Sequence, residues 1–277
     1  MFDGPVENAS LRVLSLGAGV QSSVMALMAA HGEIAPMPDA AIFAATQWAP
    51  ESGYEHLDWL ETQLPFPVYK VSEGNLREDV LSTTLSDKTN ASIPFFMTPD
   101  SGMLWRQCTK NYKVIPITRK IKELLGLEKY QRVAKNTLVE RWMGISLDEV
   151  IRAKDSPDKW AVNRYPLIEK RLSRFHCQTW FEKYYPGRKL NKSACIGCPY
   201  HSNFSWRAKK LNDPISWNDA VDFDYRLRSG PRKACGGQEK AYLHRSLIPL
   251  DQVDLSTEQD KGQMDMFGEE CEGMCGV

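Results

Sequence analysis

The sequence lacks a long apolar run. No stretch of its 277 residues approaches the roughly 18 consecutive apolar residues from which a membrane-spanning helix is made. The N-terminal segment is acidic and polar, and no basic patch precedes an apolar run there, which argues against a secretory signal. These two absences favour a cytoplasmic protein without membrane contact.

Net charge is also lacking, because 35 Lys and Arg balance 35 Asp and Glu. This balance argues against a protein that coats nucleic acid indiscriminately. It hides an asymmetry, since residues 251–277 carry eight acidic side chains and one basic one. Residues 1–250 therefore have a net charge of +7, which suits a phosphate-rich small ligand or a locally docked nucleic acid. An acidic tail that only maintains solubility is the alternative explanation.

Cysteines are few, and their number, seven, is odd. A disulfide framework of a secreted protein is therefore not expected, and metal, cluster or redox chemistry better explains the cysteines that lie close in sequence. Internal repeats and heptad runs are absent as well. The hydrophobic residues, 42% of the chain, are sufficient for a sizeable core and exclude wholesale disorder.

The pattern that is present predicts an α/β fold. A short β-prone run leads at once into a glycine-rich turn and then into helix-forming residues, the opening of a nucleotide-binding unit. Continued alternation predicts a Rossmann-like parallel sheet with helices on both faces. The expected strands are residues 11–16, 40–45, 67–71 and 139–145, and the expected helices are 24–30, 51–64 and 115–125. Residues 82–103 are expected to form a long loop that could cover the site.

The turn at residues 17–23 reads Gly-Ala-Gly-Val-Gln-Ser-Ser. Its glycines let the backbone approach an anion, and free N–H groups at the start of a helix point toward it. Ser22 and Ser23 add hydroxyl donors and can cap the helix. The turn is not a P-loop, because no lysine follows, and it lacks the third glycine of the dinucleotide fingerprint. A tight connection without a ligand is the alternative.

This turn resembles the pyrophosphate loop, Ser-Gly-Gly-x-Asp-Ser, of ATP-dependent adenylating enzymes and phosphoadenosine phosphosulfate (PAPS) reductases. Gly17, Ala18 and Gln21 stand where that superfamily has serine, glycine and aspartate. Gln21 can form hydrogen bonds but cannot pair with a magnesium ion, so phosphate binding is expected ahead of classical ATP cleavage. The resemblance also makes Gln21 a candidate catalytic residue.

Four later segments resemble the same superfamily in the same order. Residues 46–54 resemble its Asp-Thr-Gly-x-x-x-Pro-Glu-Thr segment, and residues 105–117 resemble the Cys-Cys-x-x-x-Lys-x-x-Pro-Leu segment of the reductases. Residues 144–149 resemble Gly-Ile-Arg-x-x-Glu-Ser, and residues 165–168 the Pro-Leu stretch that follows. The chain looks especially like the reductase-like proteins often found in phages and prophages. The resemblance implies these nucleotide-binding residues: Ser15, Gly17, Ala18, Gly19, Gln21, Ser22, Ser23, Thr46, Glu51, Lys110, Gly144, Ser146, Asp148 and Glu149.

Residues 195–198 read Cys-Ile-Gly-Cys, a knuckle that places two thiolates on one side of a tight turn. Two further ligands are needed, and Cys108 and Cys177 would complete a site with Cys195 and Cys198. The resemblance implies a [4Fe–4S] cluster there, since some sulfonucleotide reductases take ligands from corresponding segments. Zinc in the same site, or four unligated cysteines, are the alternatives. His201 is a further candidate ligand, with a purely hydrogen-bonding role as its alternative.

Near the end of the sequence, Met274-Cys275-Gly276 resembles the mobile Glu-Cys-Gly tail that carries the nucleophilic cysteine of PAPS reductases. The resemblance implies that Cys275 is a catalytic nucleophile and that a thioredoxin-like thiol serves as reductant. Two inert thiols, Cys271 and Cys275, are the alternative.

Basic and aromatic residues alternate in the middle of the chain and could bind a 3′-phosphate or an RNA or DNA backbone. A solvated helix face is the alternative. These residues are Lys110, Lys113, Arg119, Arg141, Arg171 and Arg174, with Trp105, Tyr112 and Trp180 among them.

Three regions are expected. Residues 1–160 form an adenine-nucleotide-binding α/β domain, residues 161–250 form a helical and loop region with the Cys-x-x-Cys site, and residues 251–277 form an acidic, flexible tail. The favoured hypothesis is an enzyme that binds ATP or (phospho)adenylylsulfate, with magnesium as a further candidate cofactor. It would carry out sulfur transfer, reduction or adenylation-dependent modification of a small molecule or of a base in tRNA or DNA. The alternatives are a genuine (phospho)adenylylsulfate reductase that releases sulfite, and a non-catalytic, zinc-stabilised module that binds nucleotides or nucleic acid.

Overall fold

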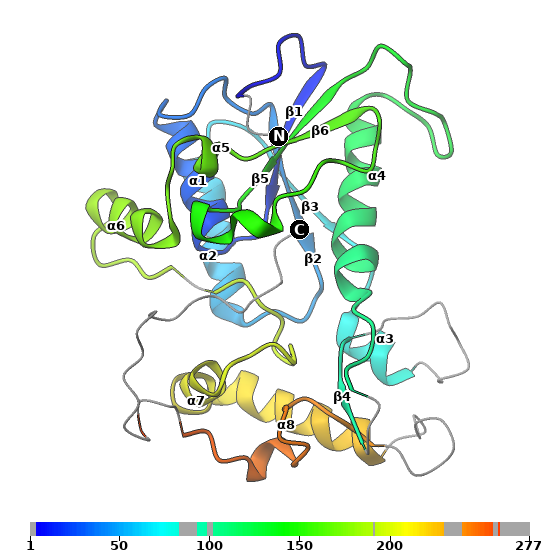
Figure 1. Ribbon diagram of the computed structural model, residues 1–277, viewed down its shortest axis with the longest axis vertical. Helices are drawn as coiled ribbons and strands as arrows, with labels where there is room; N and C mark the ends of the chain where they lie inside the picture. Colours follow the sequence, from blue (N-terminus) through cyan, green and yellow to red (C-terminus); the bar gives the residue numbers. More distant parts are fainter. Residues whose placement is uncertain are drawn as a thin grey trace.

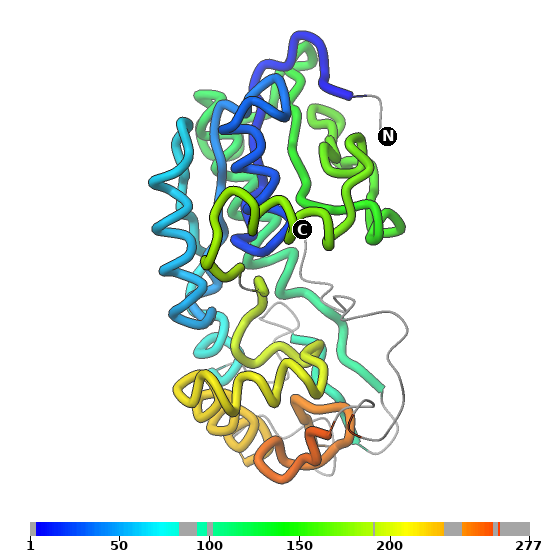
Figure 2. Tube along the Cα trace, turned by 90° about the vertical axis from the view of Figure 1, so that its left-hand side faces the viewer, coloured from blue at the N-terminus to red at the C-terminus, as the bar shows by residue number. Residues whose placement is uncertain are grey.

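A computed structural model describes residues 4–82, 93–98, 102–190, 192–229, 240–256 and 260 of the chain. These residues form a five-stranded parallel sheet with flanking helices and, next to it, a smaller region of helices with a two-stranded sheet (Figures 1 and 2). Cys235, Cys271 and Cys275 lie outside the described residues, as does most of the acidic segment. The α/β class and the parallel sheet agree with the sequence prediction.

The sheet has the strand order β3-β2-β1-β5-β6, and every neighbouring pair is parallel. β1 lies between β2 and β5, so chain connections leave it in opposite directions, which makes the β1–β5 junction a topological switch point. Four strands lie within two residues of the predicted bounds. The strands are Leu11–Leu16 (β1), Ala40–Ala45 (β2), Val68–Ser72 (β3), Val139–Met143 (β5) and Ala161–Arg164 (β6).

Strand β6 was not predicted, because residues 161–164 were assigned to the helical region. The boundary expected at residue 160 therefore separates this strand from the sheet to which it belongs. The sequence does not reveal β6, because this strand has only four residues, two of them polar, and shows no apolar alternation. Its Arg164 is nevertheless buried, because the neighbouring strand β5 supplies Glu140 as a partner.

Helices cover both faces of the sheet, as predicted. The apolar residues of β1 alternate between the two layers: Leu14 packs with the helices on one face and Val13 packs with α4 on the other. α4 continues directly from the π-helical turn η1 (Lys110–Val114). The helices on the first face are Val20–Ala30 (α1), Glu51–Gln63 (α2), Pro166–Glu169 (α5) and Arg174–Tyr184 (α6), and Ile115–Leu124 (α4) covers the second face.

Helix α1 begins earlier than its composition predicted. It starts at Val20, directly after Gly19, so Gln21 and Ser22 belong to its first turn. Residues 20–29 are buried on all sides because α1 lies between the sheet, α2 and α6. A helix in the interior of this kind does not need an exposed polar face, which explains why amphipathic periodicity did not mark its start.

The smaller region has its own apolar core. Trp206 and Phe223 are fully buried there, and Trp217 is nearly so, as expected for core aromatics. Part of the predicted loop 82–103 is a strand, since β4 (Phe96–Met97) pairs antiparallel with β7 (Ala241–Tyr242). The other elements are Leu76–Ser82 (α3), Asn203–Asn212 (α7), Pro214–Ser229 (α8) and Leu250–Gln252 (η3). None of the helices in the described ranges combines the length and apolar composition that crossing a bilayer requires.

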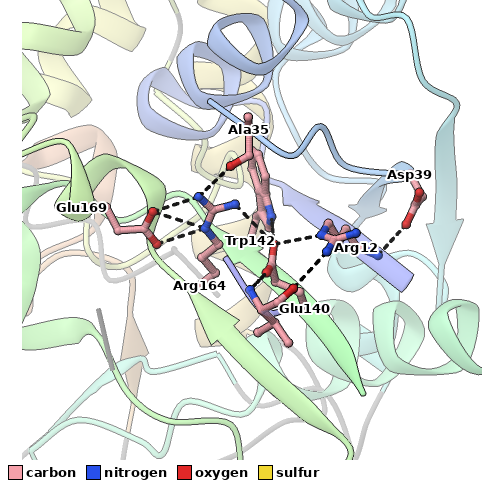
Figure 3. Close-up of polar contacts among 8 residues, drawn as sticks. Arg12, Ala35, Asp39, Glu140, Trp142, Arg164 and Glu169 are labelled. Atoms are coloured by element: carbon pink, nitrogen blue, oxygen red, sulfur yellow. Dashed lines mark hydrogen bonds and ion pairs between the residues drawn. The ribbon is translucent and has the colours of Figure 1, made fainter. Parts of the chain in front are cut away.

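A buried ion network connects β1, β5 and β6 (Figure 3). Glu140 of β5 is fully buried and accepts hydrogen bonds from Trp142 Nε1 at 2.6 Å and Arg164 Nη1 at 3.4 Å. Arg12 of β1, the register partner of Glu140, places its Nε 3.8 Å from the same carboxylate. Arg164 also forms a two-pronged pair with Glu169, with contacts of 3.1 and 2.9 Å. The two arginines of this network are therefore balanced by its two glutamates, Glu140 and Glu169.

Candidate functional site

A pocket opens at the carboxyl ends of β1, β2 and β5, beside the switch point of the sheet. Ligands of open α/β sheets bind at this position. The turn after β1 forms one wall, Thr46 and the start of α2 form a second, and the segment between α6 and α7 forms a third. The pocket thus combines segments that are far apart in the sequence.

The turn after β1 is organised by the side chain of Ser22. Its Oγ accepts hydrogen bonds from the backbone N–H groups of Gly17 and Gly19, at 3.2 and 3.3 Å. Ala18 adopts a positive φ of 52°, a conformation that non-glycine residues rarely adopt. The first intrahelical bond runs from Ser23 N to Gly19 O, so the N–H groups just before it have no partner within the helix. A helix start of this kind at a pocket is a favourable position for an anion.

Two glycines of the pocket are needed for close backbone contact. A Cβ atom at Gly19 would lie 2.9 Å from Cβ of Ser193, and a Cβ atom at Gly144 would lie 2.9 Å from the backbone of Ser22. Ser193 also donates a hydrogen bond from Oγ to the carbonyl of Gly17. The segment 192–195 therefore lies directly against the turn and closes one side of the pocket.

Gln21 holds the centre of a polar cluster on the wall of the pocket. Its Oε1 accepts a hydrogen bond from Arg174 Nη1 at 3.1 Å, and its Nε2 lies 3.4 Å from both Ser146 Oγ and Glu149 Oε2. An aspartate at this position could not donate to Glu149 and would place two carboxylates close together. The arrangement gives a physical reason for glutamine where the resembling loop has aspartate.

Positive charge predominates around the pocket. Lys113, Arg152, Arg174 and Lys192 line it, and Glu149 is the one carboxylate among the described residues of the lining. Arg152 forms an ion pair with Glu149 at 2.8 Å, and burial raises the pKa of Glu149. A pocket with this excess of cations attracts an anionic ligand.

Most residues implied by the resemblance line this pocket, but five do not. Ser23 is the clearest exception, because its Oγ points into the core and lies 3.0 Å from Nε2 of the buried His56. Ser146 and Asp148 do not line the pocket. Asp148 instead accepts a hydrogen bond from the backbone N–H of Arg174. Glu51 and Lys110 are likewise outside the lining. The lining includes Ser15, Gly17, Ala18, Gly19, Gln21, Ser22, Thr46, Gly144 and Glu149.

The sequence analysis missed several residues of the pocket, of which Arg152, Ser193 and Ser52 carry polar groups. Arg152 could have been found as the basic residue that follows the predicted Gly144–Glu149 segment. No sequence signal marks Ser193, because its role depends on the path of the chain across the turn. Two of the interleaved cations, Arg119 and Arg141, instead pair with Glu73 and Asp158, and Tyr112 is buried.

The knuckle at residues 195–198 lies against the loop after β2. Cys195 lines the pocket, with Sγ 3.3 Å from Thr46 Oγ1. The backbone N–H of Ile196 donates to Trp48 O at 2.9 Å, and a Cβ atom at Gly197 would lie only 2.2 Å from the Trp48 ring. The sequence Cys-Ile-Gly-Cys is therefore a tightly packed turn that presents one thiol to the pocket.

Cys177 lies in a different apolar core from Cys108 and Cys195, with which it was predicted to share a metal. Cys177 is fully buried in the core between α6 and α1, where burial raises the pKa of its thiol to about 12. Cys108 and Cys195 instead pack against the core of the smaller region. Within the described ranges, no three His, Cys, Asp or Glu side chains form a group suited to a metal ion. Sequence spacing did not reveal that Cys177 lies on the buried face of its helix.

His201 has a hydrogen-bonding role. Its Nε2 lies 3.0 Å from the carbonyl of Cys195 and 3.2 Å from Nζ of Lys209. Burial lowers the pKa of His201 well below its usual value and lowers the pKa of Lys209 to about 8. Both side chains support the backbone of the knuckle.

Comparison of the chain with models of known protein families and with curated proteins found no match.

Proposed function

We propose that this protein is an enzyme that binds an adenine nucleotide by its phosphates in the pocket at the carboxyl edge of the sheet. One observation carries the proposal: the amino end of α1, with its glycine-rich turn, faces a pocket that four cations and, among the described residues, one carboxylate line. Backbone N–H groups and cationic side chains are the groups that bind phosphate. The choice of adenine rests on the resemblance of five segments to the PAPS reductase superfamily.

The pocket residues can be given roles in this function. The start of α1 binds the phosphate chain. Arg174, which Gln21 holds by a hydrogen bond, places its positive charge beside the phosphates. Lys113 and Lys192 stand on other sides of the same pocket and offset charge that develops on the phosphates during reaction. In the favoured reaction, ATP adenylates a carbonyl or carboxylate oxygen with release of pyrophosphate. A sulfur or other nucleophile then displaces AMP.

A sulfonucleotide reductase is the second candidate, and the thiol of Cys195 on the pocket wall favours it. A thiolate would attack the sulfur of the sulfonucleotide and break the sulfur–oxygen bond, and AMP would leave with the electron pair. A second thiol would then attack the cysteine Sγ and release sulfite, leaving a disulfide. A dithiol protein of the thioredoxin class would supply the electrons that reduce it. Cys275, the nucleophile implied by the resemblance, lies outside the described residues.

Calorimetric titration of the purified protein with ATP and with adenylylsulfate tests the proposal. Binding of either nucleotide is expected, and it should be weakened by Gly19→Ala, which pushes Ser193 away from the turn. Thr62→Ala is the control, since this exposed residue of α2 lies outside the pocket lining. Absence of binding, or equal effects of both substitutions, would overturn the proposal. Pyrophosphate release identifies the adenylating reaction, and sulfite release identifies the reductase.

A further inference from the structure

A strongly basic segment lies beside the pocket. Residues 104–135 contain nine cationic side chains and two acidic ones, whereas the whole chain is neutral. We call residues 104–135 the basic segment. Its cations are Arg106, Lys110, Lys113, Arg119, Lys120, Lys122, Lys129, Arg132 and Lys135, and its acidic residues are Glu123 and Glu128.

The middle of the basic segment is one continuous helix that packs on the sheet by its apolar side. Ile117 and Ile121 are buried against β1, β2 and β5, while Lys120 lies over the Tyr69 ring of β3 and Arg119 is exposed. Figure 1 shows α4 lying along one face of the sheet. The helical part, residues 110–124, is about 22 Å long at 1.5 Å per residue. This length is comparable to several nucleotides of a nucleic-acid strand.

Within the described residues, much of this positive charge has no carboxylate partner. Arg119 pairs with Glu73, and Lys120 pairs with Glu123. For Lys110, Lys122, Lys129, Arg132 and Lys135, the described part of the chain contains no carboxylate within ion-pair distance. Arg106 donates to the hydroxyl of Thr109 and lies over the ring of Tyr200, with Cζ 5.9 Å from the ring centroid. A protein surface with this excess is complementary to a polyanion.

Two large aromatic rings are exposed in the same segment. Trp105 is 86% exposed and Tyr130 is 89% exposed, among the highest values for large hydrophobic residues in the described chain. Exposed rings among cations are the groups on which unpaired bases stack, because every base has a π face. An acidic peptide would use the cations but would leave the rings without a function.

The basic segment is continuous with the pocket, because Lys113 belongs to both. We propose that the basic segment binds a single-stranded nucleic acid and leads one of its bases toward the pocket. A base must be unpaired to enter an enclosed site, which is the reason for preferring a single strand to a duplex. The inference rests on the proposed function for the role of this strand, which would be the acceptor of the nucleotide-dependent modification.

Fluorescence anisotropy with labelled RNA and DNA strands of about 16 nucleotides, an upper site size for single-strand binders, tests the inference. The full-length protein should bind a single strand at least tenfold more tightly than the duplex of the same sequence. Lys122→Glu combined with Lys129→Glu should lower this affinity by about tenfold and reduce the salt slope by about 1.4, or 0.7 for each lost phosphate contact. Lys183→Glu combined with Lys210→Glu is the matched control, since it makes the same charge change on α6 and α7.

Stacking is tested separately with Trp105→Ala, which should weaken binding about fivefold or more. Tyr225→Ala on α8, where the ring is 61% exposed, should have no such effect. Equal losses in the test and control variants, or equal affinity for the duplex, would overturn the inference. ATP titration separates the two proposals. A protein that binds ATP but no strand refutes only this inference, and one that binds a strand but no adenine nucleotide refutes the proposed function.

Discussion

The sheet carries two polar clusters that differ in how their charges are paired. In the closed cluster, Glu140 and Glu169 meet Arg12 and Arg164, and all four are partnered within the protein (Figure 3). The open cluster lies at the carboxyl edge of the sheet, where four cations and, among the described residues, one carboxylate line a pocket. Charges that are paired inside the protein hold strands together, whereas an excess of cations on the wall of a pocket is suited to an external anion.

The largest expected effect is on the closed cluster. Glu140→Ala removes the carboxylate between Arg12 and Arg164 and leaves the buried Arg164 guanidinium with one partner fewer. Breaking a buried pair from one side costs about 3–5 kcal/mol of the free energy of unfolding. Urea denaturation measures this loss. Asp58→Ala, which breaks an exposed pair with Lys70, is the control and should cost at most about 1 kcal/mol.

The second expected effect is on the open cluster, and it concerns binding instead of stability. Arg174→Ala removes a cation from the pocket and should weaken nucleotide binding by about 1.5–3 kcal/mol, the value of a hydrogen bond to a charged group. Calorimetry measures the affinity, and urea denaturation of the same variant should show a change below about 1 kcal/mol. A variant that loses stability but keeps full affinity would mean that this cluster is structural too.

The third expected effect is a dependence on pH. Burial raises the pKa of Glu149 in the folded protein, so the folded state binds a proton more readily than the unfolded state. The stabilisation that results is lost as pH rises through the raised pKa. The free energy of unfolding should therefore gain a contribution as pH falls toward the ordinary range of a carboxyl group. Denaturation of wild type and Glu149→Gln over this range should diverge at the higher pH, where the substitution removes a penalised charge. Parallel curves would contradict the assignment.

The smallest expected effect separates two adjacent serines. Ser22→Ala removes the acceptor of two N–H groups in the turn and should weaken nucleotide binding. Ser23→Ala should leave binding unchanged and cost about 1 kcal/mol of stability, because it removes the hydroxyl that faces His56. Burial lowers the pKa of His56 to about 4, so this imidazole is neutral at pH 7 and needs no counter-charge. Equal effects of both substitutions on binding would show that the turn acts as a whole.

Much of the fold could be predicted from local patterns. The strands at residues 11–16 and 40–45 match β1 and β2, and the end predicted for the first helix, residue 30, is where α1 ends. Strand β6 could not be predicted, because its burial depends on Glu140 from another strand. The turn after β1 was correctly placed at the pocket, since a strand–glycine–helix pattern determines where backbone N–H groups gather. Ser193 could not be predicted, because its place at the pocket depends on the path of a distant segment across the turn, whereas Arg152 could have been found from its position just after the predicted segment 144–149.

By itself, the sequence determined the alternation of strands and helices and the position of the glycine-rich turn, since both arise from interactions between residues close along the chain. Tertiary structure alone decided which cysteine faces the pocket and which is buried. It also decided that Gln21 meets Arg174 and Glu149. The reason is physical: those contacts join residues more than one hundred positions apart, and the packing of helices on the sheet sets which of their faces meet.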